Sequence, residues 1–308
     1  MRRKSAAGVA ILSAILLCCC LAPSSFSVRV PDGILPIDVE PLPLNKDFSA
    51  EVASLYDGGL KSVAAAVVGL RRAIHEKPGV MYEEYDAAEI AYNTLRAIGV
   101  DESNIKTRLG VTGLVAHIGA GTLESSMRGE VPTLVLRADM DALPIMESKD
   151  NPDTRSFASR NDGVMHACGH DTHTAMLLGA AKLLKPFERA LASEGKTVRF
   201  AFQPSEEGGA GGKMMVDEGL LDGASASFAL HTSSRDRTGL IVGKHGAMNA
   251  AAGFFTFVIR GKGGHAAAPH TAIDPVNTAA QVVLSLNTIV GRMVDNPNSP
   301  VVRSIPDA

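Results

Sequence analysis

The sequence predicts an α/β protein, with a mixed or parallel sheet that carries helices on both faces, followed by the start of a smaller domain. Short β-rich apolar runs alternate with segments of helical periodicity, which is the α/β pattern. The chain has 308 residues, of which 45% are hydrophobic and 20% charged, so it can bury a substantial core. From residue 246 onward the pattern changes to a strand, a glycine-rich loop and a helix, which indicates the second domain.

The composition excludes several classes of protein. The 30 basic and 33 acidic residues give a formal net charge of -3, so no basic field favours nucleic-acid binding. The 30 Gly and 16 Pro follow no collagen-like period. The four Cys are too few for a disulfide scaffold in a chain of this length.

The N-terminus predicts a secretory signal peptide over residues 1–27. Three basic residues at 2–4 precede an apolar run at 6–22, and an uncleaved signal anchor is the alternative interpretation. Since no second long apolar stretch follows, we expect no membrane association after cleavage. Cleavage leaves Cys168 as the only cysteine in an oxidising pathway, and metal ligation would explain its retention.

The remaining elements follow in order. The proline-rich segment 28–47 predicts an extended arm, and the catalytic domain is expected over 48–245. Helical spacing of apolar residues predicts three helices, at 51–76, 83–98 and 172–184. Asp171 or Thr172 is expected to cap the third helix.

Three β-rich runs each stop at potential metal ligands. They are expected at 133–137, before Asp139 and Asp141; at 197–202, before Glu206 and Glu207; and at 226–230, before His231. In open α/β sheets the functional crevice lies beyond the carboxyl ends of the strands, so these side chains can converge. The loop at 166–171, which contains Cys168 and His170, is predicted to enter the third helix on the same side of the sheet.

A thiolate, imidazoles and carboxylates suit Zn²⁺, Mn²⁺ or Co²⁺, and bridging groups make a two-metal site feasible. The alternative for any single histidine here is a surface or hydrogen-bonded core side chain. Convergence of the strand ends favours ligation by His170 and His231 over His166 and His173, because four candidate ligands within eight residues cannot all reach one metal.

Adjacent carboxylates at Glu206 and Glu207 point to a division of roles. One can bind metal while its neighbour takes a proton from water and delivers it to a leaving amine. A solvated acidic turn is the alternative, because Glu-Glu-Gly-Gly is ordinary loop composition.

The last segment predicts a strand at 254–260, a tight loop at 261–265 and a helix at 274–290, with Asp274 as its cap. His265 in the loop is a candidate to stabilise the oxyanion of a tetrahedral intermediate. The alternative is an exposed histidine in a turn that the glycines alone require.

The motifs, taken together, resemble the amidohydrolase branch of the two-metal aminoacylase and carboxypeptidase family, and most of all the plant hydrolases of auxin (indole-3-acetic acid) conjugates with amino acids. Five motifs occur in the family's order over roughly residues 60–292. They are RRAIH at 71–75, LRADMDALP at 136–144, HACGHD at 166–171, FQPSEEG at 202–208 and GKGGHAAAPH at 261–270.

The resemblance implies a set of roles and a cellular setting. Two divalent metal ions, Mn²⁺ by preference with Zn²⁺ or Co²⁺ as alternatives, would be held by Cys168, His170, Glu207 and His231. The resemblance makes Glu206 the general base and acid, Asp141 a supporting acid and His265 the imidazole of a ferredoxin-like lid and dimerisation domain at 246–308. It implies hydrolysis of N-acyl amino acid amides, a homodimer formed through the lid, and residence in the endoplasmic reticulum lumen, or secretion if no retention signal exists.

The sequence departs from the family at its end. Members normally complete the lid, return to the catalytic domain and supply one more metal-binding histidine near the C-terminus, whereas the last histidine here is His270. We therefore expect a C-terminally truncated product or a partial sequence. The alternative to an active enzyme is an inactive family member that retains partial metal binding or pairs with full-length relatives.

Overall fold

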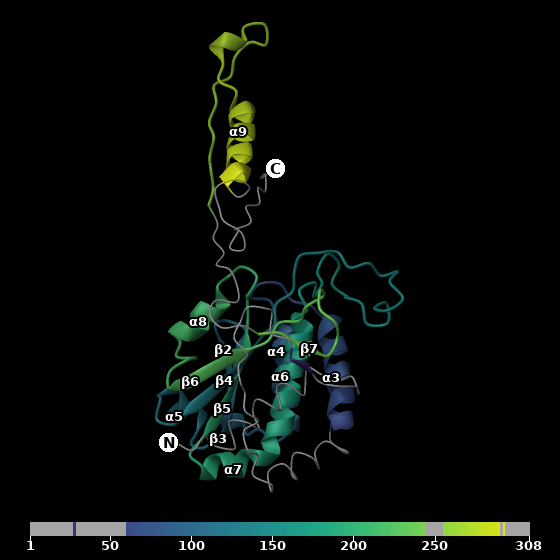
Figure 1. Ribbon diagram of the computed structural model, residues 1–308, viewed down its shortest axis with the longest axis vertical. Coiled ribbons are helices and arrows are strands. Elements are labelled where there is room, and N and C mark those ends of the chain that lie inside the picture. The colour runs from purple at the N-terminus through teal and green to yellow at the C-terminus, as the bar shows by residue number, and fades with distance from the viewer. Residues whose placement is uncertain (1–26, 29–59, 244–254, 290–291, 293–308) are drawn as a thin grey trace. The chain divides into compact units, whose positions relative to one another are not determined.

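The computed structural model describes residues 27–28, 60–243, 255–289 and 292 (Figure 1). The chain divides into two compact units between Val242 and Gly243. The predicted signal peptide and almost all of the predicted arm lie outside the described residues, so both remain predictions. Among the described residues no helix is long and apolar enough to cross a bilayer.

The first unit is built on a mixed five-stranded sheet, as the sequence predicts. Its strand order is β2 (Ile105–Leu109), β3 (Gly113–Gly119), β5 (Thr197–Gln203), β4 (Thr133–Asp139) and β6 (Ala224–Ala229). Strand β3 is antiparallel to β2 and β5, whereas β4 is parallel to both β5 and β6. The carboxyl ends of β4, β5 and β6 therefore meet at one edge of the sheet.

Helices cover both faces of this sheet (Figure 1). Strand β5 is buried along its whole length, and its alternating side chains enter two cores: Phe200 and Phe202 pack into one and Ala201 into the other. The larger core is covered by α3 (Leu60–His75), α4 (Tyr85–Ala97), α6 (His170–Leu184) and α7 (Glu188–Ser193). The smaller core is covered by α5 (Leu123–Met127) and α8 (Gly211–Asp217).

Short elements complete this unit. Two 3₁₀ turns, η2 (Glu102–Asn104) and η3 (Lys185–Phe187), lead into β2 and α7. A separate parallel pair joins β1 (Ser27–Val28) to β7 (Leu240–Ile241).

The start of α6 differs from the prediction. The helix begins at His170, and Gly169 is its N-cap in the left-handed region, at φ 88°. Asp171 does not cap the helix, because its side chain accepts hydrogen bonds from Arg71 and His75 of α3 instead. His170 therefore lies on the first turn of a rigid helix and not on the loop that precedes it. The predicted start of the first helix, at 51–59, lies outside the described residues.

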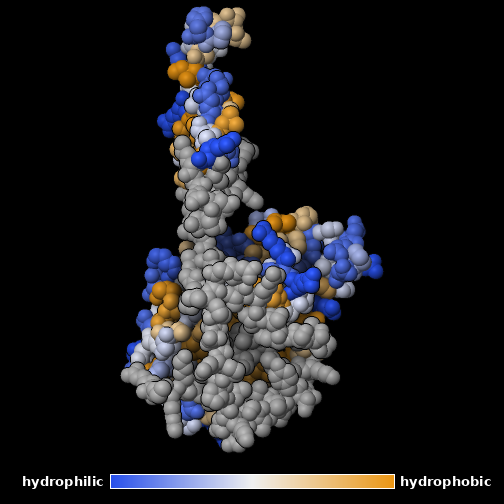
Figure 2. Space-filling view, viewed as in Figure 1, coloured by the Kyte–Doolittle hydropathy of each residue, from blue (hydrophilic) through white to orange (hydrophobic). Residues whose placement is uncertain are grey.

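The second unit contains η4 (Pro269–Thr271) and α9 (Pro275–Thr288). Asp274 accepts a hydrogen bond from the Val276 amide, which confirms the predicted cap. The predicted strand at 254–260 is wrong for the described residues 255–260, which pair with no strand in the described part of the chain. Apolar side chains of this unit are exposed and alternate with polar ones (Figure 2); they include Phe255, Phe257 and Val258.

Candidate metal centre

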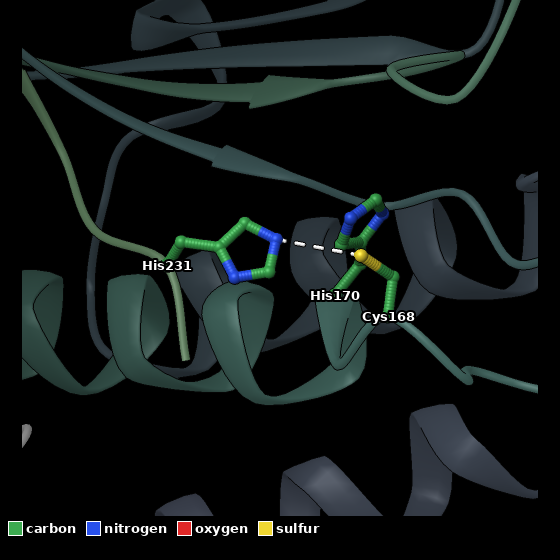
Figure 3. A group of neighbouring side chains, drawn as sticks. All are labelled: Cys168, His170 and His231. Atoms are coloured by element: carbon green, nitrogen blue, oxygen red, sulfur yellow. Dashed lines mark hydrogen bonds between the residues drawn. The ribbon is translucent and has the colours of Figure 1, made fainter. Parts of the chain in front are cut away.

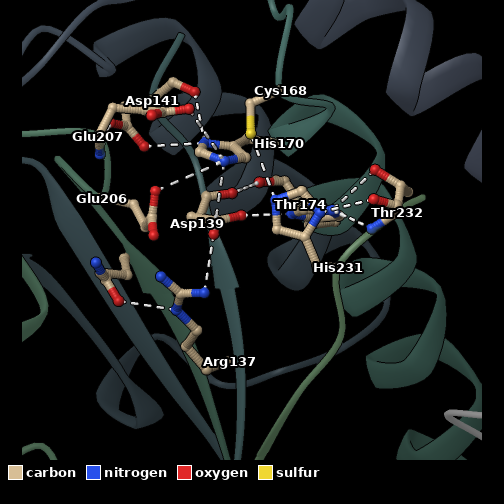
Figure 4. Close-up of polar contacts among 12 residues, drawn as sticks. Arg137, Asp139, Asp141, Cys168, His170, Thr174, Glu206, Glu207, His231 and Thr232 are labelled. Atoms are coloured by element: carbon tan, nitrogen blue, oxygen red, sulfur yellow. Dashed lines mark hydrogen bonds and ion pairs between the residues drawn. The ribbon is translucent and has the colours of Figure 1, made fainter. Parts of the chain in front are cut away.

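The carboxyl edge of the sheet gathers the side chains that the sequence singles out (Figure 4). They lie at or just after the ends of β4, β5 and β6, or at the start of α6. Three overlapping groups could each hold a metal ion, and all of them contain His170: Cys168, His170 and His231; Asp139, His170 and His173; and His170, Glu206 and Glu207. The structure thus brings every candidate of the first unit into one cluster.

His170 occupies the centre of this cluster and is fully buried. Its Nδ1 lies 2.9 Å from the Asp141 carbonyl oxygen and 3.0 Å from Asp141 Oδ1. Since both partners are acceptors, Nδ1 carries the proton and Nε2 presents its lone pair. That Nε2 has no hydrogen-bond partner although it is buried, and it lies 3.8 Å from Glu207 Oε1 and 4.0 Å from Glu206 Oε2. An unpartnered buried nitrogen facing carboxylates fits a cation.

His231 is exposed and lies beside Cys168 and His170 (Figure 3). Its Nδ1 donates to the Thr232 carbonyl oxygen over 2.7 Å, so Nε2 is the acceptor nitrogen. That Nε2 lies 3.4 Å from Cys168 Sγ. A thiol and two imidazole nitrogens gathered in this way are a ligand set that suits Zn²⁺, Mn²⁺ or Co²⁺.

Asp141 connects His170 to the glutamate loop. Its Oδ1 accepts from His170, and its Oδ2 accepts from the Glu207 amide over 2.9 Å. Burial alone would raise the pKa of Asp141, but these hydrogen bonds outweigh burial and hold the pKa below its ordinary value. Asp141 is therefore an anion that orients one predicted ligand and the backbone of another.

Both adjacent glutamates turn toward His170 Nε2, whereas regular strand backbone would direct them to opposite sides. Ser205, which precedes them, has φ 51°, and this left-handed turn breaks the strand alternation. The Glu206 side chain is 41% exposed and that of Glu207 is 28% exposed. Glu206 is therefore the more accessible of the two from solution.

His173 lies beside the cluster, and both of its ring nitrogens form hydrogen bonds. Its Nε2 accepts the Thr232 amide hydrogen over 2.9 Å, so its Nδ1 carries the proton and donates to Asp139 Oδ1 over 2.6 Å. Both ring nitrogens of His173 therefore have hydrogen-bond partners, whereas Nε2 of His170 has none among the described residues. The histidine instead ties the backbone beside His231 to the end of β4.

Negative charge dominates the cluster. Burial lowers the pKa of His170, but the hydrogen bond to Asp141 and the charges of Asp139, Asp141 and Glu207 raise it by more, so the net shift is upward. For Cys168, burial and then the neighbouring Glu207 raise the pKa to about 12. The negative potential that raises the pKa of His170 and Cys168 would also attract a divalent cation. A bound cation would deprotonate a coordinating thiol.

A close approach fixes the chain between Cys168 and His170. Gly169 has φ 88°, and a Cβ at this position would lie 2.6 Å from Thr232 Oγ1. Glycine meets both conditions, whereas any other residue would be strained at this φ and would have to displace the Thr232 hydroxyl. The segment that contains Cys168 is thereby packed directly against the segment that contains His231.

His265 lies in the second unit, where it is exposed and its Nδ1 accepts the Ala267 amide hydrogen over 3.1 Å. Its expected role over the site remains a prediction. Two partners of the cluster were not assigned from the sequence: His173, which binds the Thr232 amide, and Glu84, which contacts the glutamate loop from the position just before α4. The only sequence signal for Glu84 is its place in a Glu-Glu pair, a pattern that is common in exposed first turns of helices.

The fold and the cluster define a class: α/β proteins that place a metal centre at the carboxyl edge of a mixed sheet. Residues 135–245 match the family described as Peptidase family M20/M25/M40. IAA-amino acid hydrolase ILR1-like 5 of Arabidopsis thaliana is 44% identical over 236 residues, which are 77% of this chain and 50% of that protein. N-acyl-L-amino acid amidohydrolase of Geobacillus stearothermophilus is 41% identical over 256 residues, or 83% of this chain and 63% of that protein.

A solved structure agrees with these matches. A candidate aminohydrolase from methicillin-resistant Staphylococcus aureus superposes with a TM-score of 0.56 and 30% identity, covering 78% of this chain and 60% of that one. The chain belongs to the M20 peptidase family. It spans about half the length of the plant relatives that it matches.

Proposed function

We propose that the protein is a metal-dependent amidohydrolase of N-acyl amino acids, and that conjugates of indole-3-acetic acid with amino acids are its substrates. The observation that carries the proposal is the unpartnered, buried Nε2 of His170, which faces Glu206 and Glu207 beside a thiol and a second imidazole. The names of the Arabidopsis and Geobacillus relatives support the amide bond as the target and the auxin conjugate as the substrate.

The donor set fits two divalent ions, held by Cys168, His170, Glu207 and His231, with Mn²⁺ preferred on the family resemblance and Zn²⁺ or Co²⁺ compatible with the same donors. When bound, such ions supply a Lewis acid that polarises the amide carbonyl and makes water more acidic. Asp141 and the Thr232 carbonyl oxygen keep the histidines in the tautomer that presents Nε2.

Glu206 performs the proton transfers. Its carboxylate takes a proton from the attacking water, whose oxygen bonds to the amide carbon, and then delivers that proton to the nitrogen as the carbon–nitrogen bond breaks. The products are a carboxylate and a free amino acid. Its exposed position, beside but not among the four proposed ligands, suits a group that must meet substrate.

The setting of the reaction is also proposed. The basic and apolar pattern at residues 1–27 supports entry into the secretory pathway, with the endoplasmic reticulum lumen as the site of action. The exposed Phe255 and Phe257 of the second unit support a homodimer formed through that unit.

The test is release of alanine from indole-3-acetyl-alanine by the purified protein with added Mn²⁺. We expect turnover by the unmodified chain, and loss of turnover with retained metal in Glu206→Gln. Glu89→Gln, an exposed glutamate of α4, is the matched control and should behave as wild type. Folded, metal-loaded protein that releases no alanine would contradict the proposal and favour the inactive family member.

A further inference from the structure

We propose that Glu84 is a positioning residue that sets the direction of the Glu206 carboxylate through the backbone of Ser205. This inference rests on the proposed role of Glu206 in proton transfer. Glu84 is fully buried and lies immediately before α4, whereas Glu206 lies in the loop after β5. The two are 122 positions apart, so only the fold brings them near each other.

The Glu84 carboxylate accepts hydrogen bonds from three places in the chain. Its Oε1 accepts the Tyr82 amide over 2.9 Å and the Ser205 amide over 2.9 Å, and its Oε2 accepts the Thr112 hydroxyl. Glu84 occupies the N-cap position of α4, but its side chain makes no capping hydrogen bond to that helix. The carboxylate is therefore directed away from the helix it precedes and toward the loop that contains Glu206.

The bonded segments share an unfavourable backbone conformation. Tyr82 has φ 63°, Ser205 has φ 51°, and Val111, next to Thr112, has φ 80°. Residues other than glycine rarely adopt these values, and a β-branched valine does so least readily. Such strain persists where surrounding contacts hold it, and it concentrates at functional sites. Among the side chains that the structure describes, Glu84 is the one that bonds directly to Tyr82, to Ser205 and to Thr112, the neighbour of Val111.

The turn at Ser205 determines where the next side chain points. Glu207 has a second fixed contact, because its amide donates to Asp141, and as a proposed ligand it would also be held by metal. The Glu206 amide also lies near Asp141, but it lowers the pKa of that carboxyl less than the Glu207 amide does. Since Glu206 is not among the proposed ligands, the direction of its side chain depends mainly on the backbone that precedes it. Release of the Ser205 amide would therefore disturb Glu206 more than Glu207.

Burial raises the pKa of Glu84, and the donors that surround it offset only part of that effect. A carboxyl group is costly to bury, so its presence needs a compensating purpose. At this position one side-chain atom must accept the amides of Tyr82 and Ser205, and the other must pair with the Thr112 hydroxyl. Glutamine can meet both needs, because Thr112 can accept from an amide nitrogen as readily as it donates to a carboxylate.

The test compares Glu84→Ala, Glu84→Gln and the neighbouring exposed Glu83→Ala in the metal-loaded full chain. We expect Glu84→Ala to lower kcat by about 10- to 100-fold with little change in KM or metal content, because a displaced proton-transfer group slows chemistry more than binding. Glu84→Gln should stay within about threefold of wild type, since it can keep the hydrogen bonds. Glu83→Ala should match wild type.

A second measurement does not depend on activity. Hydrogen exchange of the Ser205 amide, followed by NMR, should accelerate by about tenfold or more in Glu84→Ala but not in Glu84→Gln, while the Glu207 amide stays protected by Asp141. If the unmodified chain shows no turnover, the proposed function fails, and this exchange result still decides whether Glu84 holds the loop.

Three results would overturn the inference. The first is a Glu84→Ala protein with a lower melting temperature but an unchanged kcat, which would mean a purely structural role. The second is a Glu84→Gln protein as slow as Glu84→Ala, which would mean that charge matters and hydrogen bonding does not. The third is unchanged exchange of the Ser205 amide. If Glu84→Ala does not fold, Glu84→Asp, shorter by one methylene, replaces it with the same expectations.

Discussion

Replacement of Asp141 by asparagine should weaken metal binding without unfolding the protein. Asp141 Oδ1 accepts from His170 Nδ1 over 3.0 Å, and Oδ2 accepts from the Glu207 amide over 2.9 Å. Asparagine keeps the shape but has one acceptor oxygen, so one of these two contacts is lost. A hydrogen bond to a charged group contributes about 1.5–3 kcal/mol. Loss of an outer partner of a metal ligand weakens affinity by about 10- to 100-fold, or about 1.4–2.7 kcal/mol, and the two estimates agree.

The assay is isothermal titration of the metal-free protein with Mn²⁺, repeated for Asp141→Asn and for Asp150→Asn, a change at an exposed loop aspartate. We expect weaker binding only in Asp141→Asn, with metal-free melting temperatures that differ little among the three proteins. Equal affinity in Asp141→Asn and wild type would refute the role given to Asp141. Equal weakening in the Asp150→Asn control would show that net charge, and not the contact with His170, determines affinity.

Other changes should separate ligation, stability and loop geometry. Cys168→Ala should lower the metal content that remains after dialysis, measured by elemental analysis, because loss of a direct ligand should weaken affinity by more than the about 10- to 100-fold that loss of an outer partner costs. Full occupancy would exclude the thiol as a ligand. Burial lowers the pKa of His117, so the folded state binds fewer protons, and stability should fall as the pH drops below about 6.5, by up to about 1.4 kcal/mol per pH unit. Buried His166, whose pKa is lowered to about 4, adds a slope of the same sign, so urea unfolding should show a smaller slope in His117→Gln than in wild type; equal slopes would contradict the contribution of His117. Gly209→Ala should destabilise the protein by about 1–3 kcal/mol and lower kcat, because the new Cβ would overlap Ser205 Oγ and the Tyr82 ring; thermal unfolding and kinetics at the wild-type level would show that the loop can shift.

The convergence of the cluster was predictable because it follows from topology. Parallel strands end at a common edge, so residues after β4, β5 and β6 meet there whatever separates them in sequence. His170 and His231 could be selected because each stands beside such an end. The sequence also contained the reason to rank His173 lower, since neighbouring histidines on one loop and helix cannot all reach one ion.

Other features depend on contacts that no local pattern records. The left-handed turn at Ser205 is held by Glu84 from a distant segment, so no local pattern indicates that Glu206 and Glu207 both turn toward His170. The predicted start of α6 was wrong because the Asp171 side chain bonds to Arg71 and His75 of α3 and does not cap its own helix. Local capping rules do not include such distant partners. The run at 255–260 has strand composition, but a strand requires a hydrogen-bonded neighbour.

The contact between Gly169 and Thr232 limits how this centre can be redesigned. A library that seeks a different metal preference would vary Cys168 and His231, two of the proposed donors that solvent reaches. Any side chain at 169 would strain the left-handed backbone there and would have to displace the Thr232 hydroxyl, so we expect those clones to bind metal less well whatever donors they encode. A useful library therefore keeps Gly169 constant and samples donor chemistry on an unaltered backbone.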